Sequence, residues 1–248
     1  FFVMSRQPPR STLFPYTTLF RSKAYRAIAQ QESPDTFVIF GAVHTHGVTR
    51  PSLWKAGKWQ TPLGDIEIDE ELSGKILGET SPIHDHSNAH VREHSIEVQV
   101  PFLKLLFPKA RIVPIMVPPM DSAAKIGEYV ASKIGEKKVI ALGSTDMTHY
   151  GTRFGFAPAG LGKQGLDWVK QENDRRMLDI ILNLEIEKIV PEAEENWNAC
   201  GSGAISATVG FARFMGRSSG TLLEYTTSWD VHPEGEIDTF VGYASVVF

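Results

Sequence analysis

The sequence predicts an α/β protein, a single three-layer α/β/α domain built on a mostly parallel or mixed sheet. Short apolar runs rich in β-branched and aromatic residues, at positions 36–43, 111–117 and 138–143, are typical of buried strands. Between them lie stretches whose apolar residues recur at helical spacing, such as residues 121–134 and 166–184. Strands that alternate with helices indicate a sheet covered by helices on both faces.

The strand candidates differ in the burial that their patterns predict. Residues 36–43 and 138–143 are continuous apolar runs, whereas residues 65–69 alternate isoleucine with acids and predict a strand exposed on one face. Residues 111–117 contain Pro114, which has no backbone N–H to donate, so we expect this strand at a sheet edge or a bulge. Two further strands are predicted near the C-terminus, at residues 221–226 and 239–248.

The helix candidates are marked by caps, prolines and small residues. Residues 121–134 open with an Asp-Ser pair, and both residue types are good N-caps. Residues 93–107 fit a helix in which Pro101 removes one backbone donor and produces a kink. Residues 201–215 are rich in small residues and nearly uncharged, so we expect this helix to be buried against the sheet.

Composition excludes several classes of protein. The chain of 248 residues has a formal net charge of −4 and therefore lacks the basic footprint of a nucleic-acid-binding protein. No apolar run reaches the roughly 18 residues of a membrane-spanning helix. The single cysteine, Cys200, cannot form an intrachain disulfide, which fits a reducing compartment and predicts a cytoplasmic protein.

Residues 1–22 are interpreted as foreign to the fold. Their prolines, scattered Phe and Leu, and repeated Thr follow neither a helical nor a strand period. The stretch from Pro8 to Ser22 resembles the conceptual translation of a sequencing-adapter oligonucleotide. We expect this segment to be disordered and the α/β domain to occupy residues 23–248. A disordered natural N-terminus is the alternative.

Ionisable residues of metal-ligand type follow three of the predicted strands. They are His44, His46, Asp146, His149, Asp230 and His232. Ligands bind to open α/β sheets beyond the carboxyl ends of the strands, so we expect these side chains at one edge of one sheet. Each of them also has a plainer interpretation, because a lone histidine often satisfies a backbone carbonyl and an aspartate after a strand often caps a helix.

A second cluster of histidines and acids precedes the helix predicted at residues 93–107. On a helix, His90 and His94 share one face at a spacing of four, and Glu97 follows three residues after His94. The cluster lacks the HExxH order of zinc proteases. We expect His94 and Glu97 to support the metal ligands or to face the substrate, and His84 and His86 to be exposed in a polar loop.

Cys200 stands immediately before the small-residue helix predicted at residues 201–215. The N-terminus of a helix stabilises a thiolate, which would make this residue reactive. The alternative is a small buried side chain at a close helix contact. No nucleophile elbow, Walker loop or dinucleotide fingerprint is present in the sequence.

Five sequence blocks resemble, in order, those of the Memo family (AmmeMemoRadiSam system protein B), which is related to class III extradiol dioxygenases. The blocks are GAVHTHGV, REHSIEVQVPFL, LGSTDMTHYG, ACGSGAI and YTTSWDV. The resemblance implies a dioxygenase-like fold, with AMMECR-type and radical SAM proteins as partners. It implies that His44 binds a metal, that His149 is the acid/base with Asp146 beside it, and that the pocket contains His46, His94, Glu97 and Cys200.

One family block has no counterpart in this sequence. Family members carry a further metal-binding histidine in a His-Ala-Gly-Tyr-like block before the first buried strand, whereas residues 23–35 contain no histidine. We interpret this as N-terminal truncation and expect weak or no metal binding, since too few ligands remain. Asp230 is the predicted second ligand, because a carboxylate suits the two-histidine, one-carboxylate arrangement of non-haem Fe(II).

Two functions of different kinds are predicted. The first is Fe(II)-dependent oxygenation of a small chelating substrate, with His149 transferring the proton. The second is a non-catalytic metal- or peptide-binding module that acts with the AMMECR-type and radical SAM partners. Copper or zinc is the alternative metal, and zinc-dependent hydrolysis is a third possibility without a recognisable motif.

Overall fold

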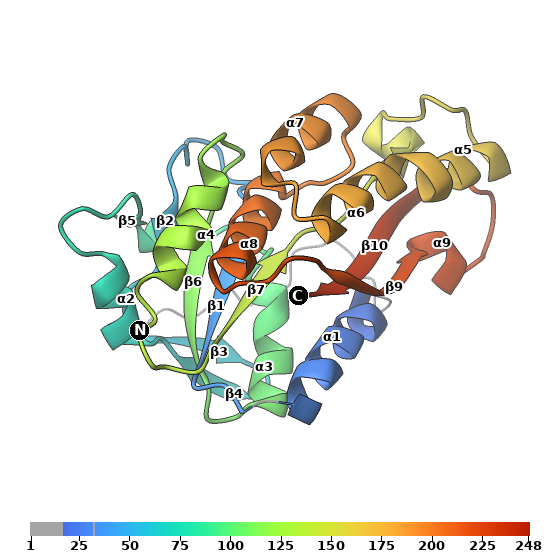
Figure 1. Ribbon diagram of the computed structural model, residues 1–248. Coiled ribbons are helices and arrows are strands. Elements are labelled where there is room, and N and C mark those ends of the chain that lie inside the picture. The colour runs from blue at the N-terminus through green and yellow to red at the C-terminus, as the bar shows by residue number, and fades with distance from the viewer. Residues whose placement is uncertain (1–16, 32) are drawn as a thin grey trace. The chain divides into compact units, whose positions relative to one another are not determined.

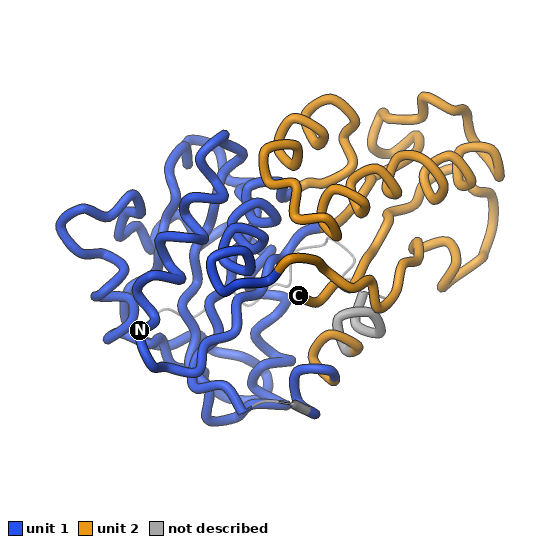
Figure 2. The backbone as a smooth tube through the Cα atoms, in the orientation of Figure 1, with its two compact units in different colours: residues 1–11, 27–145, 201–217 blue, residues 12–26, 146–200, 218–248 orange. Residues whose placement is uncertain are grey.

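A computed structural model describes residues 17–31 and 33–248, which form two compact units (Figure 2). Among the described residues, the first unit contains residues 27–145 and 201–217. The second contains residues 17–26, 146–200 and 218–248. Helix α1 (Thr17–Gln31) is divided between them.

A five-stranded mixed sheet forms the centre of the first unit, which confirms the predicted α/β class (Figure 1). Its order is β5-β2-β6-β1-β7, and β1, β6 and β7 are parallel, so their carboxyl ends share one edge. The short β2 is antiparallel to β6 and parallel to β5. The bounds are β1 (Thr36–Gly41), β2 (Ser52–Leu53), β5 (His84–Asp85), β6 (Arg111–Met116) and β7 (Val139–Ser144).

Helices cover both faces of this sheet, as the sequence predicted. On one face Val38 and Phe40 of β1 belong to an apolar core shared with α4 (Ala123–Ala131) and α8 (Ser202–Phe214). Figure 1 shows these two helices in front of the sheet. On the other face the ring of Phe37 lies 4.9 Å from that of Phe107, at the end of α3 (Val100–Leu106).

The prediction that Pro114 marks an edge or a bulge is wrong, because β6 is an interior strand. The carbonyl of Pro114 accepts a hydrogen bond from the backbone N–H of Trp54, so this residue directs its backbone toward β2. Strand β2 is only two residues long and pairs with Ile115 and Met116. The backbone of Pro114 thus faces the end of this short strand, where no β2 residue needs the N–H that proline lacks.

The predicted helix over residues 93–107 is also wrong in its first half. Residues 93–96 are irregular, η2 (Glu97–Gln99) is a 3₁₀ turn, and α3 begins at Val100. Pro101 therefore stands in the first turn of α3, where its missing N–H costs no helical hydrogen bond. His90 ends the separate 3₁₀ turn η1 (Ser87–His90), so it does not share a helix face with His94.

The remaining elements of the first unit lie before η1. A hairpin of β3 (Lys58–Thr61) and β4 (Gly64–Glu67) buries Ile66 and leaves Asp65 partly exposed and Glu67 exposed, as the isoleucine–acid alternation predicted for these residues. The strand ends at Glu67, so the predicted strand over residues 65–69 is two residues too long. Helix α2 (Glu70–Ile76) follows. The side chain of Asp69, almost wholly buried, caps α2 by accepting the N–H of Leu72 and also pairs with Lys137.

The second unit contains a separate antiparallel sheet of order β8-β10-β9. The predicted C-terminal strands are β9 (Thr221–Thr227) and β10 (Thr239–Val247), joined by β8 (His149–Gly151). The expectation that the strand before Asp230 shares one sheet with the strand before His44 is therefore wrong. Helices of this unit are α5 (Lys163–Trp168), α6 (Asp174–Leu182), α7 (Ile186–Asn196) and α9 (Ser228–Val231).

The long helix predicted at residues 166–184 is interrupted by a π-helical turn. This turn, η4 (Val169–Asn173), joins α5 to α6. Its last residue, Asn173, has a buried side chain and directly precedes α6. Such turns are frequent at functional sites. The short 3₁₀ turn η3 (Thr152–Phe154) follows β8.

The segment interpreted as foreign lies mostly outside the described residues, which begin at residue 17. Residues 17–22 of that segment form the first turns of α1. Within the part of the chain that the structure describes, no helix is long and apolar enough to cross a membrane.

Candidate functional site

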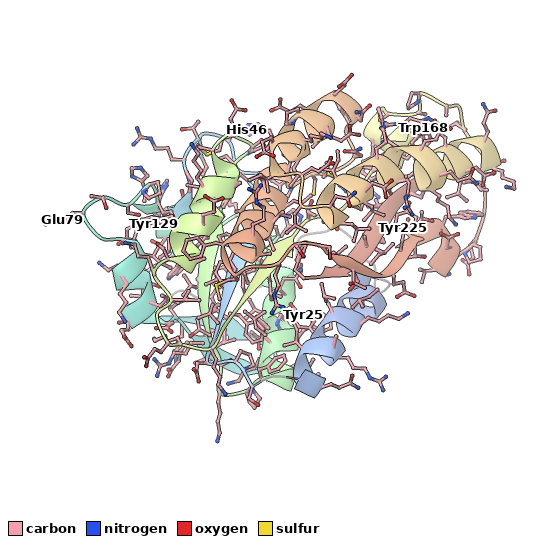
Figure 3. All side chains as sticks on the ribbon, in the orientation of Figure 1. Tyr25, His46, Glu79, Tyr129, Trp168 and Tyr225 are labelled. Atoms are coloured by element: carbon pink, nitrogen blue, oxygen red, sulfur yellow. The ribbon has the colours of Figure 1, made fainter. Side chains whose placement is uncertain are left out.

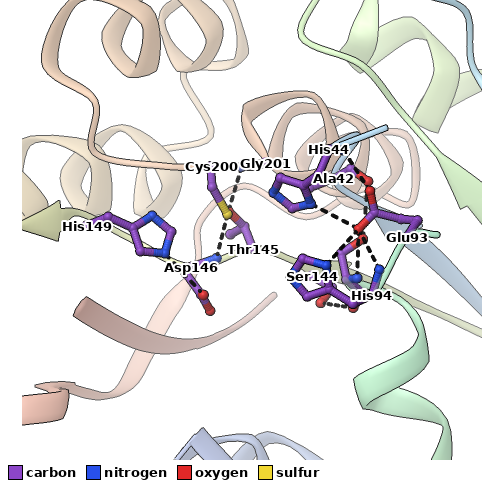
Figure 4. Close-up of polar contacts among 11 residues, drawn as sticks. Ala42, His44, Glu93, His94, Ser144, Thr145, Asp146, His149, Cys200 and Gly201 are labelled. Atoms are coloured by element: carbon purple, nitrogen blue, oxygen red, sulfur yellow. Dashed lines mark hydrogen bonds and ion pairs between the residues drawn. The ribbon is translucent and has the colours of Figure 1, made fainter. Parts of the chain in front are cut away.

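Three residues of metal-ligand type meet at the carboxyl edge of the five-stranded sheet: His44, Glu93 and His94 (Figure 4). His44 follows β1 by three residues, and the other two lie in the irregular segment between η1 and η2. One potential ligand atom from each residue lies within 4.8 Å of the others. The described residues therefore contain a possible metal-binding site, part of which the sequence predicted.

Hydrogen bonds from two strand ends fix the irregular segment that carries Glu93 and His94. The hydroxyl of Ser95 donates to the carbonyl of Ala42, just beyond β1, at 3.2 Å. The hydroxyl of Ser144, the last residue of β7, donates to the carbonyl of Ser95 at 2.5 Å. Gln99 in turn donates its amide to the Ser144 hydroxyl. The segment is thus held against β1 and β7 although it has no regular structure.

Glu93 is the buried centre of the cluster, with a side chain that is 1% exposed. Its Oε1 accepts the backbone N–H groups of His94 and Ser95 at 2.8 and 2.9 Å. Its Oε2 accepts the backbone N–H of His44 at 2.7 Å. Burial alone would raise the pKa of this carboxyl, but these hydrogen bonds and the His44 ring outweigh it and lower the pKa to about 2. Glu93 is therefore a carboxylate at neutral pH.

The two histidine rings flank that carboxylate. Nδ1 of His44 lies 2.9 Å from Oε1 of Glu93, and Nδ1 of His94 lies 3.6 Å from the same oxygen. The rings stack with their centroids 5.0 Å apart. The His44 side chain is 35% exposed and that of His94 is 55% exposed, so the cluster is open to solvent on the histidine side.

The donor set fits a divalent metal. Two neighbouring ligands at right angles, each about 2.1 Å from a metal, lie about 3 Å apart, close to the separations of the Glu93 oxygen from the two ring nitrogens. Imidazole suits zinc, copper and iron alike, while two histidines with one carboxylate is the set that non-haem Fe(II) enzymes use. Metal ligands must be deprotonated, and the lowered pKa of Glu93 meets this requirement.

The other histidines and acids predicted around this cluster lie elsewhere. His46 is exposed (Figure 3), and so are His84 and His86, as expected for the latter two. Glu97 is half-buried, which raises the pKa of its carboxyl, and it does not belong to the cluster. His90 is buried and its Nε2 lies 3.0 Å from the carbonyl oxygen of Ser52, so the plainer interpretation of a histidine beside a backbone carbonyl applies to it.

A second group of predicted residues lies in the other unit. Nε2 of His149 and Oδ2 of Asp146 are 3.5 Å apart, both side chains being about one-third exposed. The thiol sulfur of Cys200 accepts the backbone N–H of Asp146 at 3.3 Å, and the N–H of Cys200 donates to the carbonyl of Asp146 (Figure 4). These contacts bring three sequence-predicted residues together, and their roles stay predictions.

A buried carboxylate supports the loop between Asp146 and His149. Oδ1 of Asp174 accepts both the N–H and the hydroxyl of Thr148, at 3.0 and 2.5 Å. Its Oδ2 accepts the hydroxyl of Tyr225 (Figure 3) at 2.7 Å. Burial raises the pKa of Asp174 to about 6 in spite of these hydrogen bonds. The network fixes the backbone one residue before His149.

Asp230 has structural partners in the second unit. Its carboxylate accepts the N–H of Thr227 while the Thr227 hydroxyl accepts the N–H of Asp230, which makes a capping box at the start of α9. The same carboxylate is 2.8 Å from Nζ of Lys170. The plainer interpretation of this aspartate as a helix cap is correct, and its assignment as a metal ligand stays a prediction. His232 pairs with Glu234.

Sequence reasoning did not single out Glu93 or Asp174. The sequence signal for Glu93 is its position directly before His94, a residue of metal-ligand type. The helix predicted over residues 93–107 hides this signal, because adjacent residues on a helix point in different directions. Asp174 carried no signal, because an acid in a long amphipathic helix is usually exposed.

The family of this chain follows from its match to a protein-family model. The model of the Memo-like protein family matches residues 14–247. The chain belongs to the Memo family. The matched range begins inside the segment, residues 1–22, that was interpreted as foreign.

Archaeal members of the Memo family are similar to nearly the whole chain. MEMO1 family proteins of Thermococcus kodakarensis, Pyrococcus abyssi and Thermococcus onnurineus are 39%, 38% and 36% identical to it. The similarity covers 91–92% of this chain and 80% of each relative. Among solved structures, an uncharacterized protein of Escherichia coli K12 has a TM-score of 0.48 at 12% identity, covering 92% of this chain and 91% of that one.

Proposed function

We propose that this Memo-family protein is a non-haem Fe(II) protein with oxygenase activity and that His44, His94 and Glu93 hold the metal. The observation that carries the proposal is the buried, ionised carboxylate of Glu93 between two exposed imidazoles. The set is of the two-histidine, one-carboxylate type. Glu93 supplies the carboxylate ligand that the sequence predicted at Asp230. Because three ligand-type residues are present, this proposal replaces the sequence-based expectation of weak or no metal binding.

Glu93 and the strand ends prepare the site before metal arrives. The carboxylate is anchored by three backbone N–H groups, so its position does not depend on the metal. One of those groups belongs to His44 itself, which fixes the backbone from which the ring projects. A preorganised set of ligands binds metal more tightly than a flexible one, because less chain entropy is lost on binding.

When bound, the Fe(II) ion would supply open coordination positions for a substrate and for O₂. The chain itself would supply proton transfer, for which His149 is the proposed group. The carboxylate of Asp146 lies 3.5 Å from Nε2 of that imidazole. Support for this role comes from the family resemblance and from the His149–Asp146 pair.

Oxygenation is tested by O₂ uptake of the Fe(II)-loaded chain with a panel of catechols, measured with an oxygen electrode. Uptake that requires both Fe(II) and a catechol, and that falls in Glu93→Gln, supports the proposal. His86→Ala is the control, since His86 is exposed and lies outside the cluster. Tight Fe(II) binding without O₂ uptake for any catechol contradicts catechol oxygenation and favours a metal-binding module acting with partner proteins.

A further inference from the structure

Two tryptophan rings and one histidine ring pack together in the first unit. Trp54 directly follows β2, Trp59 lies in β3, and His90 ends η1. The ring centroids of the two tryptophans are 5.5 Å apart, and the centroid of His90 is 6.1 Å from Trp54 and 5.9 Å from Trp59. His90 is 5% exposed and Trp59 is 8% exposed. The polar edges of these two rings are therefore shielded from bulk solvent.

The imidazole of His90 uses only one of its two nitrogens in contacts with the chain. Its Nε2 lies 3.0 Å from the carbonyl oxygen of Ser52, and a carbonyl only accepts, so Nε2 carries the hydrogen. Burial lowers the pKa of His90 to about 4, so the ring is neutral at pH 7 and Nδ1 presents a lone pair. This Nδ1 is buried and has no hydrogen-bond partner among the described residues. His90 thus provides an unused acceptor inside the cluster.

Trp59 provides the complementary group. Its indole Nε1–H, which can only donate, is buried and likewise has no partner within the described part of the chain. The neighbouring Trp54 differs, since its Nε1 donates to the carbonyl of Ala56 at 2.8 Å. Buried polar groups of folded proteins are nearly always hydrogen-bonded, either to protein atoms or to ordered water. A donor and an acceptor of neighbouring rings are therefore both available to one small ligand.

We propose that one buried water molecule bridges Trp59 and His90, accepting the indole N–H and donating to Nδ1. The pair of groups selects water over an ion. An anion accepts from the indole but has no hydrogen for Nδ1, and a cation has no lone pair for the indole hydrogen. Two nitrogens bridged by one water lie up to about 6 Å apart, because each hydrogen bond spans roughly 2.7–3.2 Å. The separation of the two rings is compatible with this distance.

The bridge links the β3–β4 hairpin to the segment that carries Glu93. The carbonyl of His90 accepts the backbone N–H of Glu93 at 3.1 Å, so one turn joins the two residues. The His90 ring attaches this turn to β2 through Ser52, and the water adds a second attachment, to β3. The inference rests on hydrogen-bond chemistry and does not require metal binding, so it is independent of the proposed function.

The test is NMR spectroscopy of the full, nitrogen-15-labelled chain in EDTA at pH 7. In a rotating-frame Overhauser spectrum, a water held beside the Trp59 indole gives that N–H a cross-peak at the water frequency, opposite in sign to the diagonal. Proton exchange with solvent gives a cross-peak of the same sign as the diagonal, which separates the two effects. Trp54 is the matched control, because its indole N–H is bonded to Ala56, and we expect at most a weak cross-peak there. A Trp59 indole without the cross-peak would overturn the proposal.

A bridging water also differs from a water bound to the indole alone. Long-range proton–nitrogen correlations are expected to show the Nε2–H tautomer of His90, and the Nδ1–H tautomer would overturn the bridge. Trp59→Phe keeps an aromatic ring and removes the donor, so we expect the Nδ1 resonance of His90 to move to higher frequency as its hydrogen bond weakens.

Trp54→Phe is the control for this shift and is expected to leave the Nδ1 resonance nearly unchanged. Equal Nδ1 resonances in the two variants would contradict a shared water. Thermal unfolding curves check that both variants fold. The cross-peak and the tautomer are measured on the parent chain and test the proposal without either variant.

Discussion

Glu93 holds His44 at two points, through the ring nitrogen Nδ1 at 2.9 Å and through the backbone N–H at 2.7 Å. The two contacts use different oxygens of one buried carboxylate, which also accepts the backbone N–H groups of His94 and Ser95. A single acid thus positions both histidines of the candidate metal site and contributes one negative charge toward a bound divalent ion.

The first prediction is that Glu93→Gln lowers Fe(II) affinity by at least roughly 10- to 100-fold, because loss of a carboxylate that only orients the ligands already costs this much in other metal sites. Glutamine keeps the shape but removes the charge and places an amide near donors. Anaerobic titration calorimetry measures the change. Glu97→Gln is the matched control, since that acid lies outside the cluster, and equal affinities for the two variants would contradict the prediction.

The second prediction concerns acid stability and His90. Burial lowers the pKa of His90 from 6.5 to about 4, so the unfolded chain binds its proton more readily than the folded chain does. Its contribution to the free energy of unfolding is therefore complete above pH 6.5 and falls as the pH drops toward 4. The loss amounts to at most about 3 kcal/mol, since one pKa unit is worth about 1.4 kcal/mol.

Urea unfolding of metal-free protein at pH 7 and pH 4.5 measures this effect. His90→Gln, which does not titrate and can still donate to the carbonyl of Ser52, is expected to lose less stability over the same pH interval than the parent chain. Equal losses in the two proteins would show that His90 is not the group responsible.

The third prediction concerns the buried Asp174. Its pKa is raised to about 6, so the folded chain holds this proton more tightly and the contribution of Asp174 to stability falls as the pH rises from 3.8 to 6. Asp174→Asn keeps an acceptor for Thr148 without the charge and is expected to be tolerated at pH 7.5. Asp174→Ala leaves the Thr148 and Tyr225 groups unpaired and should cost about 2–3 kcal/mol. Thermal unfolding of the two variants tests this, and an equal loss in both would contradict it.

The fourth prediction tests the packing of α4 against α8. A Cβ on Gly127 would overlap the backbone carbonyl of Ala207 in α8, and backbone moves only with the helix. Gly127→Ala is therefore expected to destabilise the protein by about 1–3 kcal/mol. Gly74 of α2 has no neighbour within 4 Å, so Gly74→Ala should instead stabilise by roughly 0.5–1 kcal/mol. If the two substitutions changed the free energy of unfolding in the same direction, this account would be contradicted.

Local sequence patterns predicted most of the strands and the helices α4 and α8 because these patterns reflect burial. The apolar run of β1 and the small-residue helix α8 are buried as expected, and residues 221–226 and 239–248 contain the two predicted C-terminal strands. Strand β7 is less buried than its apolar run suggested, since it stands at the edge of the sheet. How buried a strand is depends on its neighbours in the sheet, and the local sequence pattern does not identify those neighbours.

Long-range contacts account for the errors. Pro114 is tolerated in an interior strand because β2 is short, and Pro101 begins a helix instead of kinking one. The position of Glu93 depends on hydrogen bonds from Ser95 and Ser144 to residues about fifty positions away. No periodicity records such contacts, so the candidate metal cluster was recognised from the sequence only through its histidines.

The central claim is that His44, Glu93 and His94 form a metal site, and anaerobic Fe(II) titration of this chain tests it most directly. The account predicts one bound Fe(II) per chain, with at least about tenfold weaker binding in both His44→Ala and His94→Ala and no change in His86→Ala. Absence of binding, or binding that survives both histidine substitutions unchanged, would contradict it.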